Sequence, residues 1–128
     1  MDGTTKPIRV LLVDDEPMFL EALQALLDAD ARVAVVGIAV NGHDALALAL
    51  REQPDVALVD LALPGIDGLE TIRLLLAQTP ELKVVVLSGL SDGTEASAAH
   101  AAGATRFLFK GGLHDEIADA IVDAHLAA

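Results

Sequence analysis

The sequence predicts an α/β fold in which five parallel strands alternate with five helices, (βα)5, within one domain of 128 residues. Short runs rich in Val, Ile and Leu recur along the chain, as expected of strands buried on both faces of a parallel sheet. Segments with apolar residues at helical spacing separate these runs, which is the alternation that βαβ units require. The predicted strands start near Ile8, Val33, Asp55, Lys83 and Thr105.

The first two predicted helices follow the first two strands. Pro17 suits the first turn of a helix, where its missing N–H costs little. The second helix follows Asn41 and Gly42 and ends before Pro54. The apolar stripes that we expect to face the core are Phe19, Leu20, Leu23, Leu26 and Leu27 in the first helix, and Ala45, Leu46, Ala49 and Leu50 in the second.

The last three helices differ in how well the sequence defines them. Asp67, beside Gly68, has the turn chemistry of a cap for the third helix. The fourth, 95–102, is mostly Ala and Ser, so its sparse apolar contact predicts low local stability. The fifth starts near His114, where two acids suit the positive end of the helix dipole. The expected inward-facing residues are Leu69, Ile72, Leu75 and Leu76 in the third helix, and Ile117, Ile121 and Val122 in the fifth.

Composition limits where the protein works. Hydrophobic residues make up 53% of the chain, yet no apolar stretch approaches the length of a membrane span. Residues 1–7 are polar and lack the apolar core of a targeting peptide, so they are predicted to be a frayed N-terminus. Cysteine is absent, which excludes disulfides and thiolate metal sites. We therefore expect a cytoplasmic domain without membrane association.

The charge balance argues against nucleic acid as a direct ligand. The formal net charge is −12, with only eight Lys and Arg residues against 20 Asp and Glu residues. Affinity for nucleic acids rests largely on Lys and Arg that neutralise phosphates. We therefore expect this chain not to bind nucleic acid by itself, and we interpret most of its acids as solvated surface.

Polar residues close four of the predicted strands. Asp14 and Asp15 follow the first, Asp60 closes the third, Ser88 the fourth and Lys110 the fifth. In a parallel sheet all carboxyl ends lie at one edge, where ligands bind. Taken singly, these residues have ordinary interpretations as helix caps, solvated strand ends or a snorkelling lysine. Together they predict a site of three carboxylates, a hydroxyl and an ammonium group.

These groups suit a divalent cation and a phosphoryl group. Two neighbouring carboxylates raise each other's pKa unless a cation offsets their charge. Mg²⁺ often takes one or two carboxylates together with waters and phosphate oxygens. A hydroxyl and an ammonium can bind phosphoryl oxygens, and a carboxylate beside a cation can attack phosphorus to form an acyl phosphate.

Four motifs occur in order along the chain: Leu-Leu-Val-Asp-Asp-Glu (11–16), Asp-Val-Ala-Leu-Val-Asp-Leu-Ala-Leu-Pro-Gly-Ile-Asp-Gly (55–68), Val-Val-Val-Leu-Ser-Gly (84–89) and Gly-Ala-Thr-Arg-Phe-Leu-Phe-Lys (103–110). They resemble those of response-regulator receiver domains, the phosphoacceptor half of two-component signalling. The resemblance covers the domain that we assign to 8–126, and it implies a flavodoxin-like, doubly wound sheet with strand order 2-1-3-4-5. The overall pattern, including Asn41-Gly42 and Gly103-Ala104, is most similar to the NarL/FixJ type.

The resemblance implies a phosphoacceptor and a metal site. Asp60 matches the phosphoacceptor. Asp15, Asp60 and the backbone carbonyl of Ala62 match the direct ligands of Mg²⁺ or Mn²⁺, and Asp14 matches an assisting acid. These roles come from the family and not from the spacing of the residues alone.

The resemblance also implies a phosphoryl-binding switch. Ser88 matches the hydroxyl that moves toward the phosphoryl group, and Lys110 matches the lysine that pairs with that group. Phe107 occupies the position of the switch aromatic, which turns inward on activation in the family. An ordinary core phenylalanine is the alternative interpretation of Phe107.

The implied partners are proteins. A sensor histidine kinase would donate the phosphoryl group, and activation would switch a protein–protein surface and promote homodimerisation. NarL/FixJ receivers usually precede a helix-turn-helix DNA-binding domain, and no effector domain is expected within residues 1–128. Control of a transcriptional output domain and action as a stand-alone receiver in a phosphorelay both stay open.

Three other classes are less well supported. Haloacid-type phosphatases need a second Asp two residues after the nucleophile, where this chain has Ala62. A nucleotide-binding module needs a Walker A loop or a G-x-G-x-x-G after the first strand, and neither is present. A pseudo-receiver is disfavoured because all the matching site residues are intact. We therefore expect a phosphoacceptor that assists its own phosphorylation and dephosphorylation, and not an enzyme.

Two departures from the family pattern have consequences. Receivers often have a cis proline after the lysine, whereas Gly111 follows Lys110 here, and a cis bond before a non-proline residue is costly. Ala62 and Leu90 occupy the positions that border the path of attacking water. Neither side chain can hydrogen-bond a water molecule, so we expect slow loss of an aspartyl phosphate.

Overall fold

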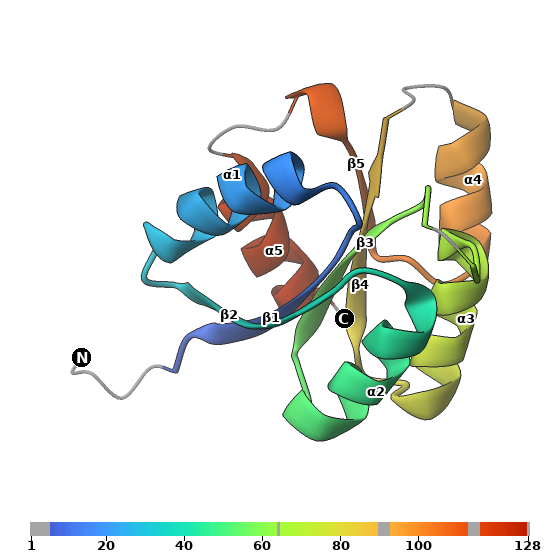
Figure 1. Cartoon of the computed structure of the whole chain (residues 1–128), viewed down its shortest axis with the longest axis horizontal. Helices are drawn as coiled ribbons and strands as arrows, with labels where there is room; N and C mark the ends of the chain where they lie inside the picture. Colours follow the sequence, from blue (N-terminus) through green and yellow to red (C-terminus); the bar gives the residue numbers. More distant parts are fainter. Residues whose placement is uncertain (1–5, 64, 90–92, 113–115, 128) are drawn as a thin grey trace.

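The predicted alternation of strands and helices is confirmed in the computed structural model, which describes residues 6–63, 65–89, 93–112 and 116–127 (Figure 1). The strands start within one residue of the predicted positions. The strands are β1 (Ile8–Val13), β2 (Val33–Ala39), β3 (Val56–Asp60), β4 (Lys83–Ser88) and β5 (Arg106–Phe109). The helices are α1 (Pro17–Asp28), α2 (Gly42–Glu52), α3 (Gly68–Gln78), α4 (Gly93–Ala101) and α5 (Glu116–Leu126), with a 3₁₀ turn, η1 (Lys110–Gly112), after β5.

The sheet has the expected strand order and orientation. Its five strands run in the order β2-β1-β3-β4-β5, and every pairing is parallel. Val13 of β1 pairs with Val59 of β3, so Asp14 and Asp60 follow matched positions on neighbouring strands. Ser88 pairs with Phe109 of β5, which puts Lys110 next along the chain. The strand register therefore places the four polar strand ends at one edge.

Two apolar layers cover the sheet. Figure 1 shows α1 and α5 on one face and α2, α3 and α4 on the other. Alternate residues of β1 contribute to the two layers, with Val10 and Leu12 packed in the α1–α5 layer and Leu11 and Val13 in the other. All four side chains are at most 1% exposed. The fully buried central strands explain the continuous apolar runs in the sequence.

The second helix differs from its prediction. Leu50 is 56% exposed, so its assignment to the buried stripe was wrong. The helix buries Gly42, Ala45 and Ala49 instead. Leu50 lies five residues after Ala45, and at 100° per residue this spacing turns it well away from the buried stripe. The asparagine before the helix caps it, because Asn41 Oδ1 accepts a hydrogen bond from the Asp44 N–H at 2.8 Å.

The fourth helix begins at another residue than predicted, and the predicted start of the fifth stays untested. Helix α4 begins at Gly93 rather than at position 95 and ends at Ala101. Among its described side chains only Ala99 is buried, which agrees with the expectation of sparse apolar contact. Helix α5 begins at Glu116, and the predicted start at His114 lies outside the described residues.

None of the helices in the described ranges combines the length and apolarity that crossing a membrane requires.

Gly68, the first residue of α3, permits close packing against the end of β3 and the residue that follows it. A Cβ at this position would lie 2.5 Å from Leu61 Cα and 2.8 Å from the backbone oxygen of Asp60. We therefore expect Gly68→Ala to lower the free energy of unfolding by about 1–3 kcal/mol. Gly37→Ala is the matched control, since the nearest atoms to its Cβ would be flexible leucine atoms at 3.5 to 3.6 Å. Equal urea-unfolding midpoints for the two variants would contradict this account.

Candidate functional site

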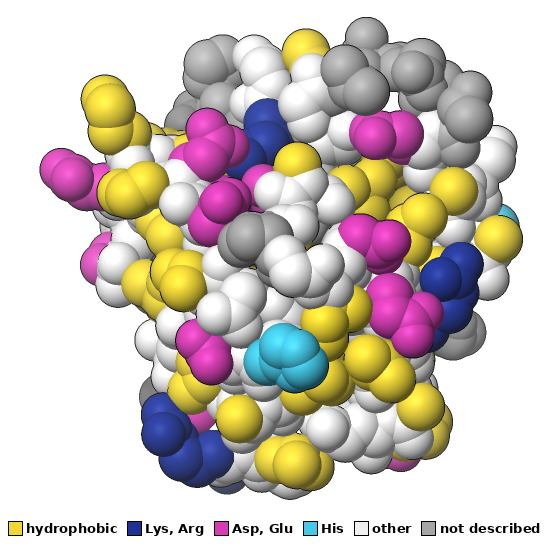
Figure 2. Space-filling view, turned by 45° about the vertical axis from the view of Figure 1, so that its right-hand side comes forward, with side chains coloured by type: hydrophobic (Ala, Val, Ile, Leu, Met, Phe, Trp, Pro, Cys, Tyr) yellow, Lys and Arg dark blue, Asp and Glu magenta, His cyan; other side chains and the backbone are white. Residues whose placement is uncertain are grey.

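Three carboxylates meet at the carboxyl edge of the sheet. Asp14, Asp15 and Asp60 each offer an oxygen, and these oxygens all lie within 4.8 Å of one another. Asp14 and Asp60 are only 1% and 3% exposed, whereas Asp15 is exposed. In the space-filling view, acidic side chains gather around a basic side chain on the upper part of the molecule (Figure 2).

Backbone amides fix the two buried carboxylates in the same manner. Asp14 Oδ1 accepts a hydrogen bond from the Glu16 N–H at 2.8 Å, and Asp60 Oδ1 accepts one from the Ala62 N–H at 3.0 Å. Each acid therefore binds the amide two residues further on and keeps its second oxygen for the site. The alternative interpretation of Asp14 and Asp15 as caps of α1 is wrong, because Glu16 is the N-cap residue and no side-chain cap bond forms.

Asp67 has the structural role that the sequence predicted. Its Oδ1 accepts a hydrogen bond from the Glu70 N–H at 2.8 Å at the start of α3. It is therefore a helix cap, and it does not belong to the group of Asp14, Asp15 and Asp60.

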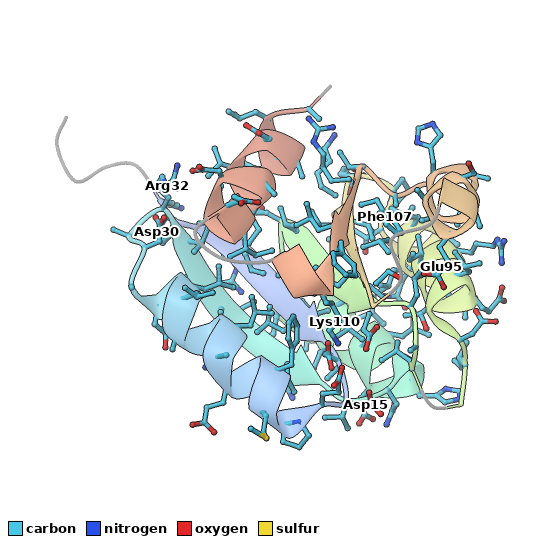
Figure 3. All side chains as sticks on the ribbon, turned by 90° about the horizontal axis from the view of Figure 1, so that it is seen from above. Asp15, Asp30, Arg32, Glu95, Phe107 and Lys110 are labelled. Atoms are coloured by element: carbon cyan, nitrogen blue, oxygen red, sulfur yellow. The ribbon has the colours of Figure 1, made fainter. Side chains whose placement is uncertain are left out.

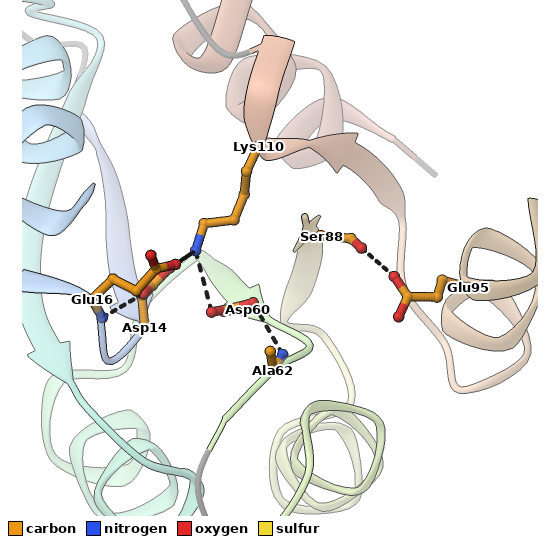
Figure 4. Close-up of polar contacts among 7 residues, drawn as sticks. All are labelled: Asp14, Glu16, Asp60, Ala62, Ser88, Glu95 and Lys110. Carbon is orange, nitrogen blue, oxygen red and sulfur yellow. Dashed lines mark hydrogen bonds and ion pairs between the residues drawn. The ribbon is translucent and has the colours of Figure 1, made fainter. Parts of the chain in front are cut away.

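Lys110 joins the two buried carboxylates. Its Nζ donates to Asp14 Oδ2 at 2.8 Å and to Asp60 Oδ2 at 3.3 Å, and it also pairs with Glu16 (Figure 4). The ammonium lies over the ring of Phe19, 4.1 Å from the centroid, where a cation–π contact adds to its stability. Lys110 therefore contacts residues at the carboxyl ends of β1 and β3 as well as helix α1.

Burial and charge act in opposite directions on these pKa values. Burial alone disfavours the Lys110 ammonium, but hydrogen bonds to Asp14 and Glu16 outweigh it and raise the pKa of Lys110 above its usual value. Burial also raises the pKa of Asp14, although the hydrogen bonds from Lys110 and the Glu16 N–H oppose this shift. Lys110 is thus charged at neutral pH, and the carboxylates around it carry an excess of negative charge. Oxygen ligands with excess negative charge suit a hard divalent cation such as Mg²⁺.

Ser88 is directed toward a residue that the sequence analysis did not identify. The side chain is 2% exposed, and its Oγ donates a hydrogen bond to the carboxylate of Glu95 in α4 (Figure 4). Glu95 lies in none of the four motifs, and only its position in the first turn of a helix was visible in the sequence.

With Asp60, Ala62 and Gly89, Ser88 and Glu95 line a cavity of about 250 Å³. Two larger hollows, of about 340 and 520 Å³, lie at the opposite edge of the sheet, far from this cluster.

The burial of Phe107 does not separate its two interpretations, a switch aromatic and an ordinary core phenylalanine. It is half-buried on β5 and packs against the layer that contains α4. With Ala96 and His100 of α4 it lines a small cavity of about 60 Å³. In Figure 3, Phe107 and Glu95 lie above and to the right of Lys110, toward α4, and Asp15 lies below it. No cis peptide bond occurs in the described ranges, which include Lys110 and Gly111, and Leu90 lies outside them.

The fold and this site define a response regulator receiver domain. The model of that family matches residues 10–122, so the chain belongs to the family. The transcriptional regulatory protein LiaR of Bacillus subtilis (strain 168) is 38% identical over 114 residues, which are 89% of this chain and 54% of LiaR. A protein-glutamate methylesterase/protein-glutamine glutaminase of Symbiobacterium thermophilum is 41% identical over 110 residues, which are 85% of this chain and 30% of that protein.

Solved receiver structures agree. The signal receiver domain of NarL from Mycobacterium tuberculosis superposes with a TM-score of 0.90 at 32% identity and covers 96% of this chain and 99% of that one. The response regulator domain of CheB from Thermotoga maritima gives 0.88 at 27% identity, over 95% and 98% of the two chains. The expected similarity to NarL-type receivers is confirmed, and methylesterase receivers are about as similar. The chain spans only 30% and 54% of the length of the two curated relatives described above.

The raised pKa of Asp14 has a consequence for stability. A carboxyl group whose pKa in the folded state exceeds its ordinary value of 3.8 favours folding only while it is protonated. That contribution is present below the ordinary pKa and is lost as the pH rises through the folded-state pKa, so ionised Asp14 opposes folding at neutral pH. We expect Asp14→Asn to raise the free energy of unfolding at pH 7 without divalent cations, and the difference to shrink toward pH 3.

Urea unfolding at pH 7 and pH 3 measures this effect. Asp123→Asn, at an exposed position of α5, is the control because it changes the net charge equally. A loss of stability in Asp14→Asn at pH 7, or a gain no larger than that of the control, would show that burial of Asp14 is not the cause.

Proposed function

We propose that Asp60 accepts a phosphoryl group from a sensor histidine kinase, with Mg²⁺ or Mn²⁺ held beside it. The observation that supports this proposal is the convergence of the three carboxylates within 4.8 Å, next to the buried Ser88 and Lys110. Membership of the receiver family agrees with it. The acidic, cysteine-free composition and its eight basic residues fit a cytoplasmic domain that binds proteins and not nucleic acid.

The oxygen ligands present fit a divalent cation. Asp15, Asp60 and the backbone carbonyl of Ala62 would bind it directly, and Asp14 would assist. When bound, the ion would offset the carboxylate charge and the negative charge of the incoming phosphoryl group. The exposure of Asp15 leaves one side of the cluster open to solvent, from which an ion and a phosphodonor can enter.

The chain's own residues account for most of the remaining chemistry. Asp60 Oδ1 accepts a hydrogen bond from the Ala62 N–H and Oδ2 accepts one from Lys110 Nζ, and one of these carboxylate oxygens attacks phosphorus. The new bond is O–P, the P–N bond of the donor phosphohistidine breaks, and the imidazole leaves and takes up a proton. Lys110, whose pKa is raised by its hydrogen bonds, stays charged and neutralises a phosphoryl oxygen. Ser88 donates a hydrogen bond to another phosphoryl oxygen. Positioning and charge neutralisation together accelerate the reaction.

The output is a change in a protein–protein surface that includes α4 and Phe107, with homodimerisation on activation. LiaR is a transcriptional regulatory protein, so control of a DNA-binding output domain is the first candidate. Action as a stand-alone receiver in a phosphorelay is the second. In both cases the domain is a phosphoacceptor and not an enzyme with a separate substrate.

Asp60→Ala tests the phosphoacceptor. We expect wild-type protein to gain the mass of one phosphoryl group with acetyl phosphate and Mg²⁺, and Asp60→Ala to gain none because the attacking oxygen is lost. Asp67→Asn is the matched control, since Asp67 lies in the loop after Asp60 and Asn also caps helices well. Intact mass spectrometry measures the labelling, and undiminished labelling of Asp60→Ala would overturn the assignment.

Ala62 is expected to lengthen the life of the aspartyl phosphate. Its side chain is exposed next to Asp60 and cannot orient an attacking water molecule. We expect Ala62→Asn to speed phosphate loss several-fold, and Ala62→Val, which adds bulk without a hydrogen-bonding group, to leave it unchanged or slower. The decay of the phosphorylated species, followed by intact mass, measures both rates. Equal rates in Asn and Val variants would show that water positioning at 62 does not limit the reaction.

A further inference from the structure

Both groups that would bind the phosphoryl group are engaged by carboxylates on opposite sides of Asp60. The Lys110 ammonium lies against Asp14 and Glu16 near the start of α1. The Ser88 hydroxyl donates to Glu95 at the start of α4 (Figure 4). Lys110 already contacts Asp60, whereas Ser88 is directed away toward α4.

We propose that Glu95 is a positioning residue that holds the Ser88 hydroxyl in the unphosphorylated domain and thereby opposes phosphorylation of Asp60. We call this Ser88–Glu95 hydrogen bond the latch. The inference rests on the proposed function, because the latch restrains a group that acts only when Asp60 carries a phosphoryl group.

Competition for one proton is the first argument. A serine hydroxyl has a single proton to donate. Ser88 is 2% exposed, and that proton is directed to a carboxylate, the stronger kind of acceptor. A phosphoryl oxygen on Asp60 requires the same proton. Phosphorylation must therefore break the latch before Ser88 can bind the phosphoryl group.

Charge is the second argument. Glu95 lines the 250 Å³ cavity together with Asp60 and Ser88. A phosphoryl group placed there brings further negative charge close to the Glu95 carboxylate, and like charges at close range repel. The repulsion favours departure of Glu95 at the same time as Ser88 turns toward the phosphoryl group.

The helix that carries Glu95 is suited to move. Among its described side chains α4 buries only Ala99, so few apolar contacts resist a shift. Ala96 and His100 of the same helix line the cavity beside Phe107. Breaking the latch therefore removes one contact that holds a helix lying beside Phe107, which links the state of Ser88 to the β5 surface.

Glu70 provides a matched control for the latch. Glu70 and Glu95 each occupy the first turn of a helix, α3 and α4. Each therefore interacts with a helix dipole. Glu70 pairs with Arg73 on the exposed surface and has no part in the Ser88 bond. Glu70→Gln thus removes the same charge from the same helical position without touching the latch.

Beryllofluoride, a phosphoryl analogue, measures the effect directly when bound with Mg²⁺. We expect Glu95→Ala to bind it about tenfold more tightly than wild-type protein, the scale of one hydrogen bond to a charged group. Glu95→Gln, which keeps the shape without the charge, should be intermediate, and Glu70→Gln should match wild type. Rates of labelling by acetyl phosphate should follow the same order. Affinities of Glu95→Ala and Glu95→Gln equal to or weaker than wild type would overturn the latch.

A double variant separates the latch from simple charge repulsion. In a Ser88→Ala background there is no hydroxyl to hold, so we expect Glu95→Ala to bring no gain in beryllofluoride affinity. An equal gain with and without Ser88 would show that the charge of Glu95 acts alone, and the latch would be rejected.

Failure of the proposed function would be recognised separately. If wild-type protein neither gains a phosphoryl group nor binds beryllofluoride, the phosphoacceptor assignment fails, and the latch is then tested on the unliganded proteins. Amide hydrogen exchange of residues 93–101 should be faster in Glu95→Ala than in Glu70→Gln, because the latch tethers α4 to β4. Equal exchange in these variants would reject the latch.

Discussion

The carboxyl edge of the sheet depends on the ion pairs that the Lys110 ammonium makes with Asp14 and Asp60. Parallel strands bring the ends of β1 and β3 together, and two nearly fully buried carboxylates, Asp14 and Asp60, follow from that topology. Burying such charges is costly unless they are paired and hydrogen-bonded. One lysine meets both, at 2.8 and 3.3 Å, and two backbone N–H groups satisfy their other oxygens. These contacts stabilise the carboxyl edge in the folded protein, but the single Lys110 ammonium does not neutralise all of its carboxylates.

This remaining negative charge at the carboxyl edge connects the fold to the chemistry of the site. The raised pKa of Asp14 means that burial outweighs the help from Lys110. Any cation or phosphoryl group that enters must work against contacts that already exist, since Lys110 is shared among Asp14, Glu16 and Asp60. The charged groups of the site thus pair with one another. A cation or phosphoryl group that bound there would replace these contacts.

The sequence predicted those features that depend on local pattern and topology. The strand starts, the strand order and the convergence of Asp14, Asp60, Ser88 and Lys110 follow from apolar runs that end in polar residues. Leu50 was wrongly assigned to the buried stripe of α2. Which residues of this short helix are buried depends on how the helix packs on the sheet around Ala45, and the apolar residues alone do not decide it. The contact of Glu95 with Ser88 was not predictable, because it depends on how α4 packs beside β4, and no local spacing encodes that packing. The same holds for the ring of Phe19 beneath Lys110.

The two groups that would bind a phosphoryl group are tethered to helices on opposite faces of the sheet. Lys110 is held by Glu16 and Phe19, at the start of α1, whose helix packs in the layer shared with α5. Ser88 is held by Glu95 of α4, in the opposite layer. A phosphoryl group on Asp60 would compete with both sets of contacts, those of Lys110 and that of Ser88, at once. Because α1 buries three leucines whereas α4 buries one alanine among its described side chains, the tether to α4 would yield first. Under the proposed function, phosphorylation of Asp60 would therefore change the α4–β5 surface more than the surface of α1.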